Sequence, residues 1–221
     1  MKVARVVDLS LAVDGDTQVF PGDPKVRLDV ACTIAQDGFN ILSVAMGSQS
    51  GTNCDAPYHF LDSGARIDEM DLRLFAGPGV IVDVRHRNDR EPITAVDVRP
   101  YVDRLTTGTI VLFNTGWSKH YWTQRYVDHP FLGEDACQLL LQQGVLTVGL
   151  DVMNIDETPD DEHPGAGWPC HRLIAEAGGV VVENLSHLDE VDFEDPFISV
   201  MPLRLTGADG APTRAVAMQL L

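Results

Sequence analysis

The chain has 221 residues, 44% hydrophobic and 22% charged, a composition typical of a folded globular protein rather than a disordered chain. With 16 basic against 33 acidic residues, its formal charge of −17 would repel a nucleic-acid backbone, so no nucleic-acid partner is expected. No apolar run approaches the roughly 20 residues that span a bilayer, and Asp8 interrupts the start before a signal-peptide core develops. We therefore expect one domain over residues 1–221, located in the cytoplasm and without a membrane partner.

The first half of the chain predicts strands separated by turns. Residues 3–11, 26–34 and 40–46 are rich in β-branched side chains and partly alternate between apolar and polar. The sequences PGDP and QDG that separate them are typical of turns. We expect these three strands to form a curled or packed antiparallel sheet.

From residue 77 the pattern changes to apolar strands that alternate with helices. Strands are expected over 77–84, 108–116, 145–152 and 180–185, and helices over 133–144 and 171–179. Such alternation indicates β-α units around a buried sheet. The tail, 197–221, predicts two more strands joined by a Gly/Asp/Pro turn. The expected fold class is therefore α/β with a mixed β-sheet.

Residues 156–167, DETPDDEHPGAG, predict one long acidic loop. This loop is either a lid over a site or a solvated charged segment. The four cysteines form no CxxC pair, so the sequence predicts neither a zinc knuckle nor a thioredoxin-type redox motif.

Residues 48–60, SQSGTNCDAPYHF, concentrate side chains that can bind metals and transfer protons. Asn53 and Asp55 are two positions apart, so both would lie on one side of an extended segment. The Asp55 carboxylate can anchor one cation or bridge two, and the His59 imidazole can exchange protons near neutral pH. The residues alone leave a second interpretation open, namely an Asx-turn loop with a surface histidine.

Residues 49–60 resemble the signature HxGTHxDxPxHF of the cyclase-like metal hydrolase family, which includes bacterial kynurenine formamidase and isatin hydrolase. Similarity continues through FPGDP, GPGVIVDV, LFNTGW, GLDVMNID and VENL, and so covers nearly the whole chain. The resemblance implies a barrel-like or swivelling β/β/α domain that assembles as a homodimer or homotetramer, with sites near subunit contacts. The signature positions that match are Gly51, Thr52, Asp55, Pro57, His59 and Phe60.

The resemblance also implies roles for residues in this stretch. In the family, two histidines and the aspartate bind one divalent ion, the aspartate bridges to a second, and the later histidine acts as general base and acid. His59 stands at that last position, whereas Gln49 and Asn53 stand at the positions of the two metal-binding histidines. Amide oxygens are harder and weaker ligands than imidazole, so this position would suit manganese, magnesium or calcium better than zinc.

His171 and Glu183 are the expected remaining ligands. His171 follows Pro169 at a predicted helix start, and Glu183 ends a valine strand after a diglycine stop. Taken singly, His171 is better explained as an ordinary residue at a helix N-terminus, and Glu183 as a surface acid at a strand end. The resemblance implies that Asp55, His171 and Glu183 bind a divalent ion, manganese or zinc, with one or two ions per chain.

Five aromatic residues lie in turn-rich stretches beside the similar blocks, where they could wall an apolar pocket or pack in the core. We expect Phe20 and Trp117 to contact an aromatic or cyclic small-molecule substrate. The full set is Phe20, Trp117, Tyr121, Trp122 and Trp168.

The leading functional hypothesis is a metal-dependent hydrolase that cleaves the C–N bond of a small cyclic or aryl amide or formamide, as an arylformamidase does. One alternative is a lyase or cyclase that acts through a metal-stabilised enolate. Another is a non-catalytic protein that binds a small molecule, for which the replacement of two histidines by Gln49 and Asn53 is the main argument.

Overall fold

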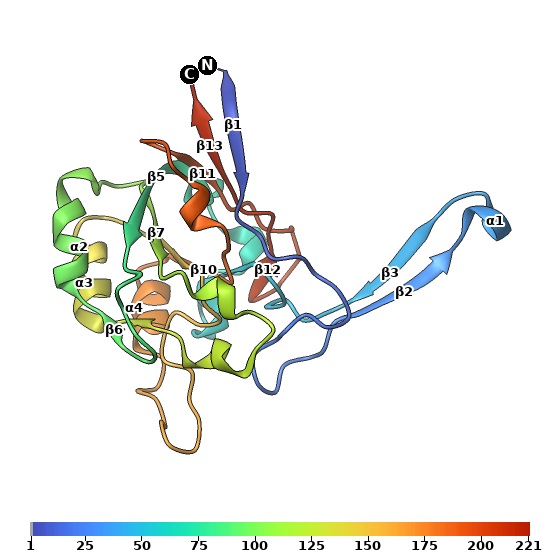
Figure 1. Ribbon diagram of the computed structural model, residues 1–221, viewed down its shortest axis with the longest axis horizontal. Coiled ribbons are helices and arrows are strands. Elements are labelled where there is room, and N and C mark those ends of the chain that lie inside the picture. Colours follow the sequence, from blue (N-terminus) through green and yellow to red (C-terminus); the bar gives the residue numbers. More distant parts are fainter. Residues whose placement is uncertain (1) are drawn as a thin grey trace.

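The computed structural model describes residues 2–221, and its centre is a large mixed sheet (Figure 1). Within these residues the sheet has nine strands in the order β1-β13-β11-β5-β7-β9-β10-β4-β12. The sheet curls into a half-barrel, which confirms the predicted α/β class with a mixed, barrel-like sheet. Its strands are β1 (Val3–Asp8), β4 (Asn53–Asp55), β5 (Ala76–Asp83), β7 (Ile110–Asn114), β9 (Thr147–Leu150), β10 (Val180–Glu183), β11 (Phe197–Ser199), β12 (Gly210–Pro212) and β13 (Val216–Leu220).

The parallel strands β5, β7, β9 and β10 form the middle of this sheet. Every residue of β7, β9 and β10 is buried, as expected for strands covered on both faces. Along β7, Val111 and Phe113 join one hydrophobic core, and Ile110 and Leu112 join the core on the opposite face. The strands predicted over 77–84, 108–116, 145–152 and 180–185 are therefore confirmed.

Helices cover one face of the parallel strands, as the β-α pattern predicted (Figure 1). The expected helices at 133–144 and 171–179 correspond to α3 and α4, and both contribute buried side chains to the core with Val111 and Phe113. The helices are α1 (Ile34–Asp37), α2 (Ala95–Val98), α3 (Glu134–Gln142) and α4 (Pro169–Glu176). Short 3-10 helices lie at Pro57–His59, Ile67–Glu69, Leu72–Leu74, Arg99–Arg104, Trp117–His120, Gln124–Asp128 and Leu188–Glu190.

The antiparallel strand β4 joins residues 48–60, called the motif segment from here on, to the parallel strands. It pairs with β10 on one side and with β12 on the other. The tail was expected to form two strands, but it forms three, because β12 leaves β11 and β13 and pairs with β4. As a result, residues from three distant parts of the chain lie side by side at this end of the sheet.

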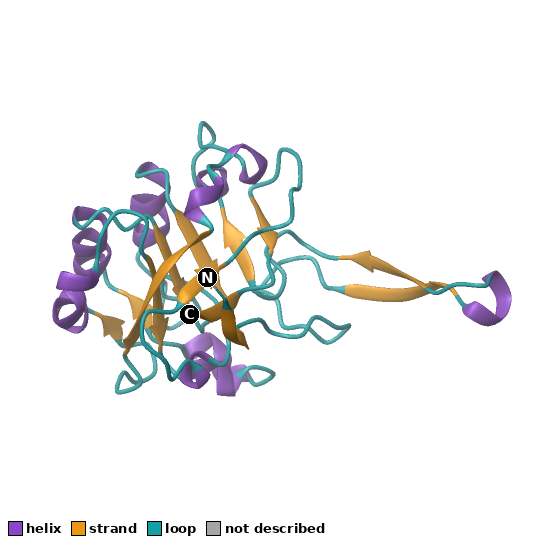
Figure 2. Cartoon of the chain, turned by 90° about the horizontal axis from the view of Figure 1, so that it is seen from above, coloured by secondary structure: helices purple, strands orange, loops and turns teal. Residues whose placement is uncertain are grey.

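The prediction of one antiparallel sheet over the first half was wrong. β1 pairs with β13, while β2 (Arg27–Cys32) and β3 (Ile41–Ala45) pair only with each other. They form a ribbon that projects away from the rest of the molecule, with α1 at its tip (Figures 1 and 2). Alternating β-branched residues identified the strands correctly, but such a pattern does not specify which strand is the partner. A small third sheet pairs β6 (Pro92–Ile93) with β8 (Phe131–Leu132).

Among residues 2–221, no helix combines the length and the apolar character that crossing a membrane requires.

Candidate functional site

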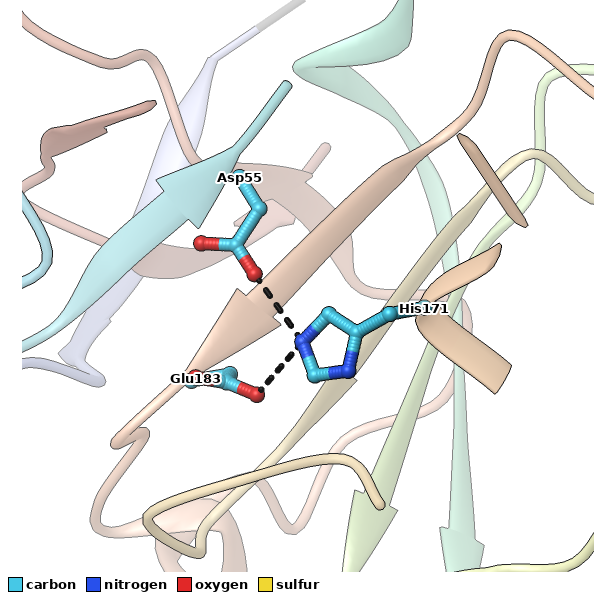
Figure 3. A group of neighbouring side chains, drawn as sticks. All are labelled: Asp55, His171 and Glu183. Carbon is cyan, nitrogen blue, oxygen red and sulfur yellow. Dashed lines mark ion pairs between the residues drawn. The ribbon is translucent and has the colours of Figure 1, made fainter. Parts of the chain in front are cut away.

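Three buried side chains from distant parts of the chain meet at one end of the central sheet (Figure 3). Asp55 lies on β4, Glu183 ends β10, and His171 lies in the first turn of α4. One ligand atom from each residue lies within 4.8 Å of those of the other two. The His171 Nε2 atom is 3.2 Å from Asp55 Oδ2 and 3.3 Å from Glu183 Oε1. The structure thus brings together the three residues that were predicted to hold one divalent ion.

The strand ladder explains why the motif segment faces Glu183. Asn53 is the direct partner of Glu183 across the β4–β10 ladder, so the two side chains lie on the same face. Asp55, two positions further along β4, points to that face as well. The expectation that Asn53 and Asp55 share one side of an extended segment is therefore confirmed.

The first turn of α4 is held by Asp156, which also orients the His171 ring. Pro169 opens the helix, and the Asp156 carboxylate accepts hydrogen bonds from the backbone N–H of Cys170 at 2.9 Å and of His171 at 3.1 Å. The same carboxylate lies 2.7 Å from His171 Nδ1. Because an ionised carboxylate only accepts hydrogen bonds, Nδ1 carries the hydrogen and Nε2 is left facing Asp55 and Glu183.

The buried charges around His171 oppose one another. Burial and the nearby charge of Asp55 raise the pKa of the Glu183 carboxyl. Burial by itself would lower the pKa of His171, but its contacts with Asp156, Asp55 and Glu183 outweigh burial and raise that pKa well above its ordinary value. The Nε2 atom of His171 and the two carboxylates thus face one position where a cation fits.

Two amide side chains beside this ligand set present oxygen atoms without a hydrogen-bond partner. The Asn53 amide nitrogen donates to the carbonyls of Gln49 at 3.2 Å and Gly51 at 3.0 Å, and the Gln49 amide nitrogen donates to Asp209 at 2.9 Å. Among the described residues, Asn53 Oδ1, Gln49 Oε1 and both carboxylate oxygens of Asp55 are buried and unpaired. The 3.2 Å approach of His171 to Asp55 lacks the geometry of a hydrogen bond.

This donor set fits a divalent cation. Buried acceptors are normally satisfied, and a concentration of unpaired ones is typical of a site for an ion. Two carboxylates, one imidazole nitrogen and two amide oxygens are all ligand types that divalent metals accept. Both amide nitrogens are already occupied as donors, so each amide offers its oxygen.

His59 lies next to the ligand set without belonging to it. Its Nδ1 atom is 2.9 Å from Asp209 Oδ2, and its ring centroid is 6.2 Å from that of His171. Burial would lower the pKa of His59, but the hydrogen bond to Asp209 and the charge of Asp55 raise it above its ordinary value. The hydrogen bond from His59 is the main reason that the pKa of Asp209 lies well below its usual range.

A cavity of about 270 Å³ opens above these residues. Three aromatic rings form a continuous part of its wall, because the Trp168 ring lies 5.9 Å from Phe20 and 6.1 Å from Phe60. Phe60 also packs on His171, with ring centroids 4.4 Å apart. The full lining is Phe20, Asp23, Gln49, His59, Phe60, Met153, Asn154, Trp168, His171, Glu183 and Asn184.

The structure does not bring Trp117 to this cavity, which corrects its predicted contact with substrate. Its side chain is buried in the hydrophobic core, and its indole N–H donates to the carbonyl of Arg125 at 3.3 Å. Tyr121 is likewise buried, and Trp122 is exposed. Phe60, at the end of the signature stretch, takes the place on the cavity wall that Trp117 was expected to fill.

Two residues of the site were missed by sequence reasoning, Asp156 and Asp209. Asp156 begins the acidic loop 156–167, whose base is also bound by Arg90 through Glu157 and the Thr158 carbonyl. The loop thus has a buried start beneath His171, while residues 160–164 are exposed. Asp156 ends the family-like segment GLDVMNID, and Asp209 lies in the turn-like segment GADGAP. Nothing in either segment indicates that its aspartate contacts a histidine of the site.

Comparison with known proteins assigns the family. A family model described as putative cyclase matches residues 7–157, and kynurenine formamidase from Bacillus cytotoxicus is 31% identical over 228 residues that cover both chains completely. The chain belongs to the putative cyclase family. Kynurenine formamidase from Bacillus mycoides is 29% identical over 98% of each chain, so similarity to these cyclase-family relatives runs the full length.

Solved structures of similar proteins share the fold. Isatin hydrolase A from Labrenzia aggregata superposes with a TM-score of 0.87 at 23% identity, over 97% of this cyclase-family chain and 93% of that one. A potential metal-dependent hydrolase with cyclase activity superposes with a TM-score of 0.79 at 26% identity, over 98% of each chain. The half-barrel of this chain is therefore a fold that solved structures contain.

The contact between Asp156 and His171 predicts an effect on metal affinity. We expect Asp156→Ala to weaken Mn²⁺ binding by roughly 10- to 100-fold, because the His171 ring loses the acceptor that orients it. Isothermal titration of the metal-free protein measures this change. Asp161→Ala, in the exposed part of the same loop, is the matched control and should leave the affinity unchanged. Equal affinities for the two variants would show that Asp156 does not support the site.

Proposed function

We propose that this cyclase-family member is a metal-dependent hydrolase of the C–N bond in a small aryl formamide or cyclic amide. The observation that carries the proposal is the buried set of Asp55, His171 and Glu183, with unpaired oxygens around it. Two of the three, His171 and Glu183, also line the aromatic-walled cavity. Its full-length similarity to proteins named kynurenine formamidase supports this reaction class.

The cavity supports the proposed substrate class. Phe20, Phe60 and Trp168 offer ring faces and edges to a flat aromatic group. No lysine or arginine is among the residues that line the cavity in the described chain, so a phosphorylated substrate would find neither of these side chains to pair with. A volume of about 270 Å³ suits a substrate with one or two rings.

For the metal, the donor set favours a hard divalent ion. Asp55, His171 and Glu183 would hold one ion, and the oxygens of Gln49 and Asn53 would extend the site toward a second. Because most of these donors are oxygens, we propose Mn²⁺ ahead of Zn²⁺. A divalent ion, when bound, supplies Lewis acidity that polarises an amide carbonyl and acidifies water.

The protein's own residues would position the substrate and move protons. The aromatic wall would hold the ring of the substrate over the ligand set and exclude bulk water from it. His59, which lines the cavity, would take a proton from the attacking water and return it to the leaving nitrogen as the C–N bond breaks. The products would be a carboxylic acid and an amine, or one ring-opened amino acid from a cyclic amide.

A test of the reaction uses formanilide, a neutral aryl formamide, with the Mn²⁺-loaded protein. We expect aniline and formate as products, and we expect His59→Ala to lower kcat by roughly 10²- to 10⁴-fold while its Mn²⁺ content stays unchanged. Liquid chromatography with mass detection identifies the products, and a His86→Ala variant, altered at an exposed histidine, is the control. Undiminished turnover by His59→Ala, or equal turnover after removal of the metal, would contradict the proposal.

We further propose that the protein acts as a homo-oligomer assembled through the β2–β3 ribbon. A two-stranded ribbon is marginally stable by itself, and this one exposes apolar side chains on both faces. Its two ends lead to Asp23 and Gln49, which both line the cavity, so a second copy packed on the ribbon would support the site. The exposed apolar residues are Val30, Ile34, Phe39, Ile41, Leu42 and Val44. A cytoplasmic location and the absence of a nucleic-acid partner stay predictions from the sequence.

The ribbon gives a direct test of assembly. We expect the wild-type protein to be a dimer or tetramer by light scattering after size-exclusion chromatography, and the double variant Val30→Glu/Val44→Glu to be a monomer, because charges on the ribbon oppose burial. Val96→Glu, at an exposed apolar side chain on α2, serves as the control. A monomeric wild-type protein at micromolar concentration would refute this assembly.

A further inference from the structure

We propose that Asp209 is the positioning residue for His59. It holds the ring with Nδ1–H directed at the carboxylate, so that Nε2 is free to accept a proton in the cavity. This inference rests on the proton-transfer role of His59 in the proposed function. It concerns a residue 150 positions away from His59 in the chain.

The Asp209 carboxylate is fixed by donors on both of its oxygens. Ser48 Oγ donates to Oδ1 at 2.8 Å, and the Gln49 amide nitrogen donates to Oδ2 at 2.9 Å. His59 Nδ1 approaches the same Oδ2 at 2.9 Å. Three contacts in this range leave the carboxylate one orientation, and His59 is held against it.

The partners also determine which ring nitrogen carries the hydrogen. An ionised carboxylate accepts only, so the hydrogen must be on Nδ1 for the 2.9 Å contact to be a hydrogen bond. The other polar group near Nδ1 is the Gln49 amide nitrogen at 3.5 Å, which is itself a donor and already bonded to Asp209. In the neutral ring, Nε2 is therefore the free base. A general base needs this arrangement in order to take a proton from water.

The sheet places Asp209 beside His59. Gly210, the next residue, begins β12 and pairs with Asp55 on β4, and the Asp209 carbonyl accepts the backbone N–H of Ala56 at 2.8 Å. A Cβ atom on Gly210 would lie 2.5 Å from the Gln49 amide nitrogen and 2.6 Å from the Cys54 carbonyl, so only glycine fits there. The pairing of β12 with β4 therefore places the Asp209 carboxylate next to His59.

One oxygen of Asp209 binds both Gln49 and His59, which links the metal position to the proton-transfer residue. Gln49 stands where the family signature has a histidine, and its amide nitrogen, bonded to Asp209, turns Oε1 away as a free acceptor. Asp209 thus orients a predicted metal ligand and the predicted general base at once. Its removal should therefore disturb the orientation of both side chains.

The test compares Asp209→Asn and Asp209→Ala with the wild-type protein, in full-length chains labelled with ¹⁵N-histidine. At a pH where the ring is neutral, we expect the metal-free wild-type protein to show His59 protonated at Nδ1. In Asp209→Ala the acceptor is lost, so the spectrum should shift toward the Nε2–H form. Asp209→Asn keeps the shape of the side chain and can turn its amide oxygen toward His59. Its His59 spectrum should therefore lie between those of the wild-type protein and Asp209→Ala.

Turnover of formanilide gives the second readout. We expect kcat to fall by roughly 10²-fold or more in Asp209→Ala and by less in Asp209→Asn, with KM little changed, because orientation of the base is lost rather than substrate binding. Asp68→Ala is the matched control, since Asp68 accepts the backbone N–H of Gly207 and holds the same loop without contacting His59. Circular dichroism verifies that each variant is folded.

Two results would overturn the proposal. An unchanged Nδ1–H signal in Asp209→Ala would show that another group orients the ring, and equal losses of kcat in Asp68→Ala and Asp209→Ala would show that Asp209 acts only by holding its loop. The spectrum does not depend on turnover. If the wild-type protein leaves formanilide intact but the tautomer shifts as expected, the positioning role stands and the proposed reaction fails.

Discussion

The site depends on one electrostatic constraint, the burial of two carboxylates, Asp55 and Glu183, beside each other. Ionised carboxylates that lose water are unfavourable unless a positive charge compensates them. Within the described chain His171 is the one side chain that lies within ion-pair distance of both carboxylates, and its second nitrogen is already bound by Asp156. Asn53 and Gln49 add further oxygen atoms, which accept hydrogen bonds and do not donate them. All these features favour a cation at this position, and they explain why the surrounding hydrogen bonds are arranged as they are.

Sheet topology makes this arrangement possible. The parallel strands end with Glu183 at the carboxyl end of β10, the edge at which open α/β sheets usually bind ligands. The antiparallel strand β4, which carries Asp55, lies between β10 and β12. It therefore has Glu183 on one neighbouring strand and Asp209 just before the other. The curled sheet therefore provides ligands, a proton-transfer histidine and its carboxylate partner from segments that no local structure could bring together.

The sequence was most informative where the chemistry is encoded locally. The family resemblance indicated Asp55, His59, His171 and Glu183 as site residues. Local patterns placed the last two at a helix start and a strand end, because capping and strand patterns have local causes. Long-range contacts were not predictable in this way. The roles of Asp156 and Asp209 arise from packing between distant segments, Trp117 lies in the core, and the strands at 26–34 and 40–46 lack the sheet partner expected for them.

Elemental analysis of the purified, unchelated protein, with Asp55→Ala as the comparison, tests most directly whether this site holds a metal ion. We expect about one or two divalent ions per chain, with manganese bound in preference to zinc when both are offered, and their loss in the variant. Two ions would show that the oxygens of Gln49 and Asn53 take part in binding. A protein that binds neither metal, even when both are supplied, would contradict the assignment of this site as a metal centre.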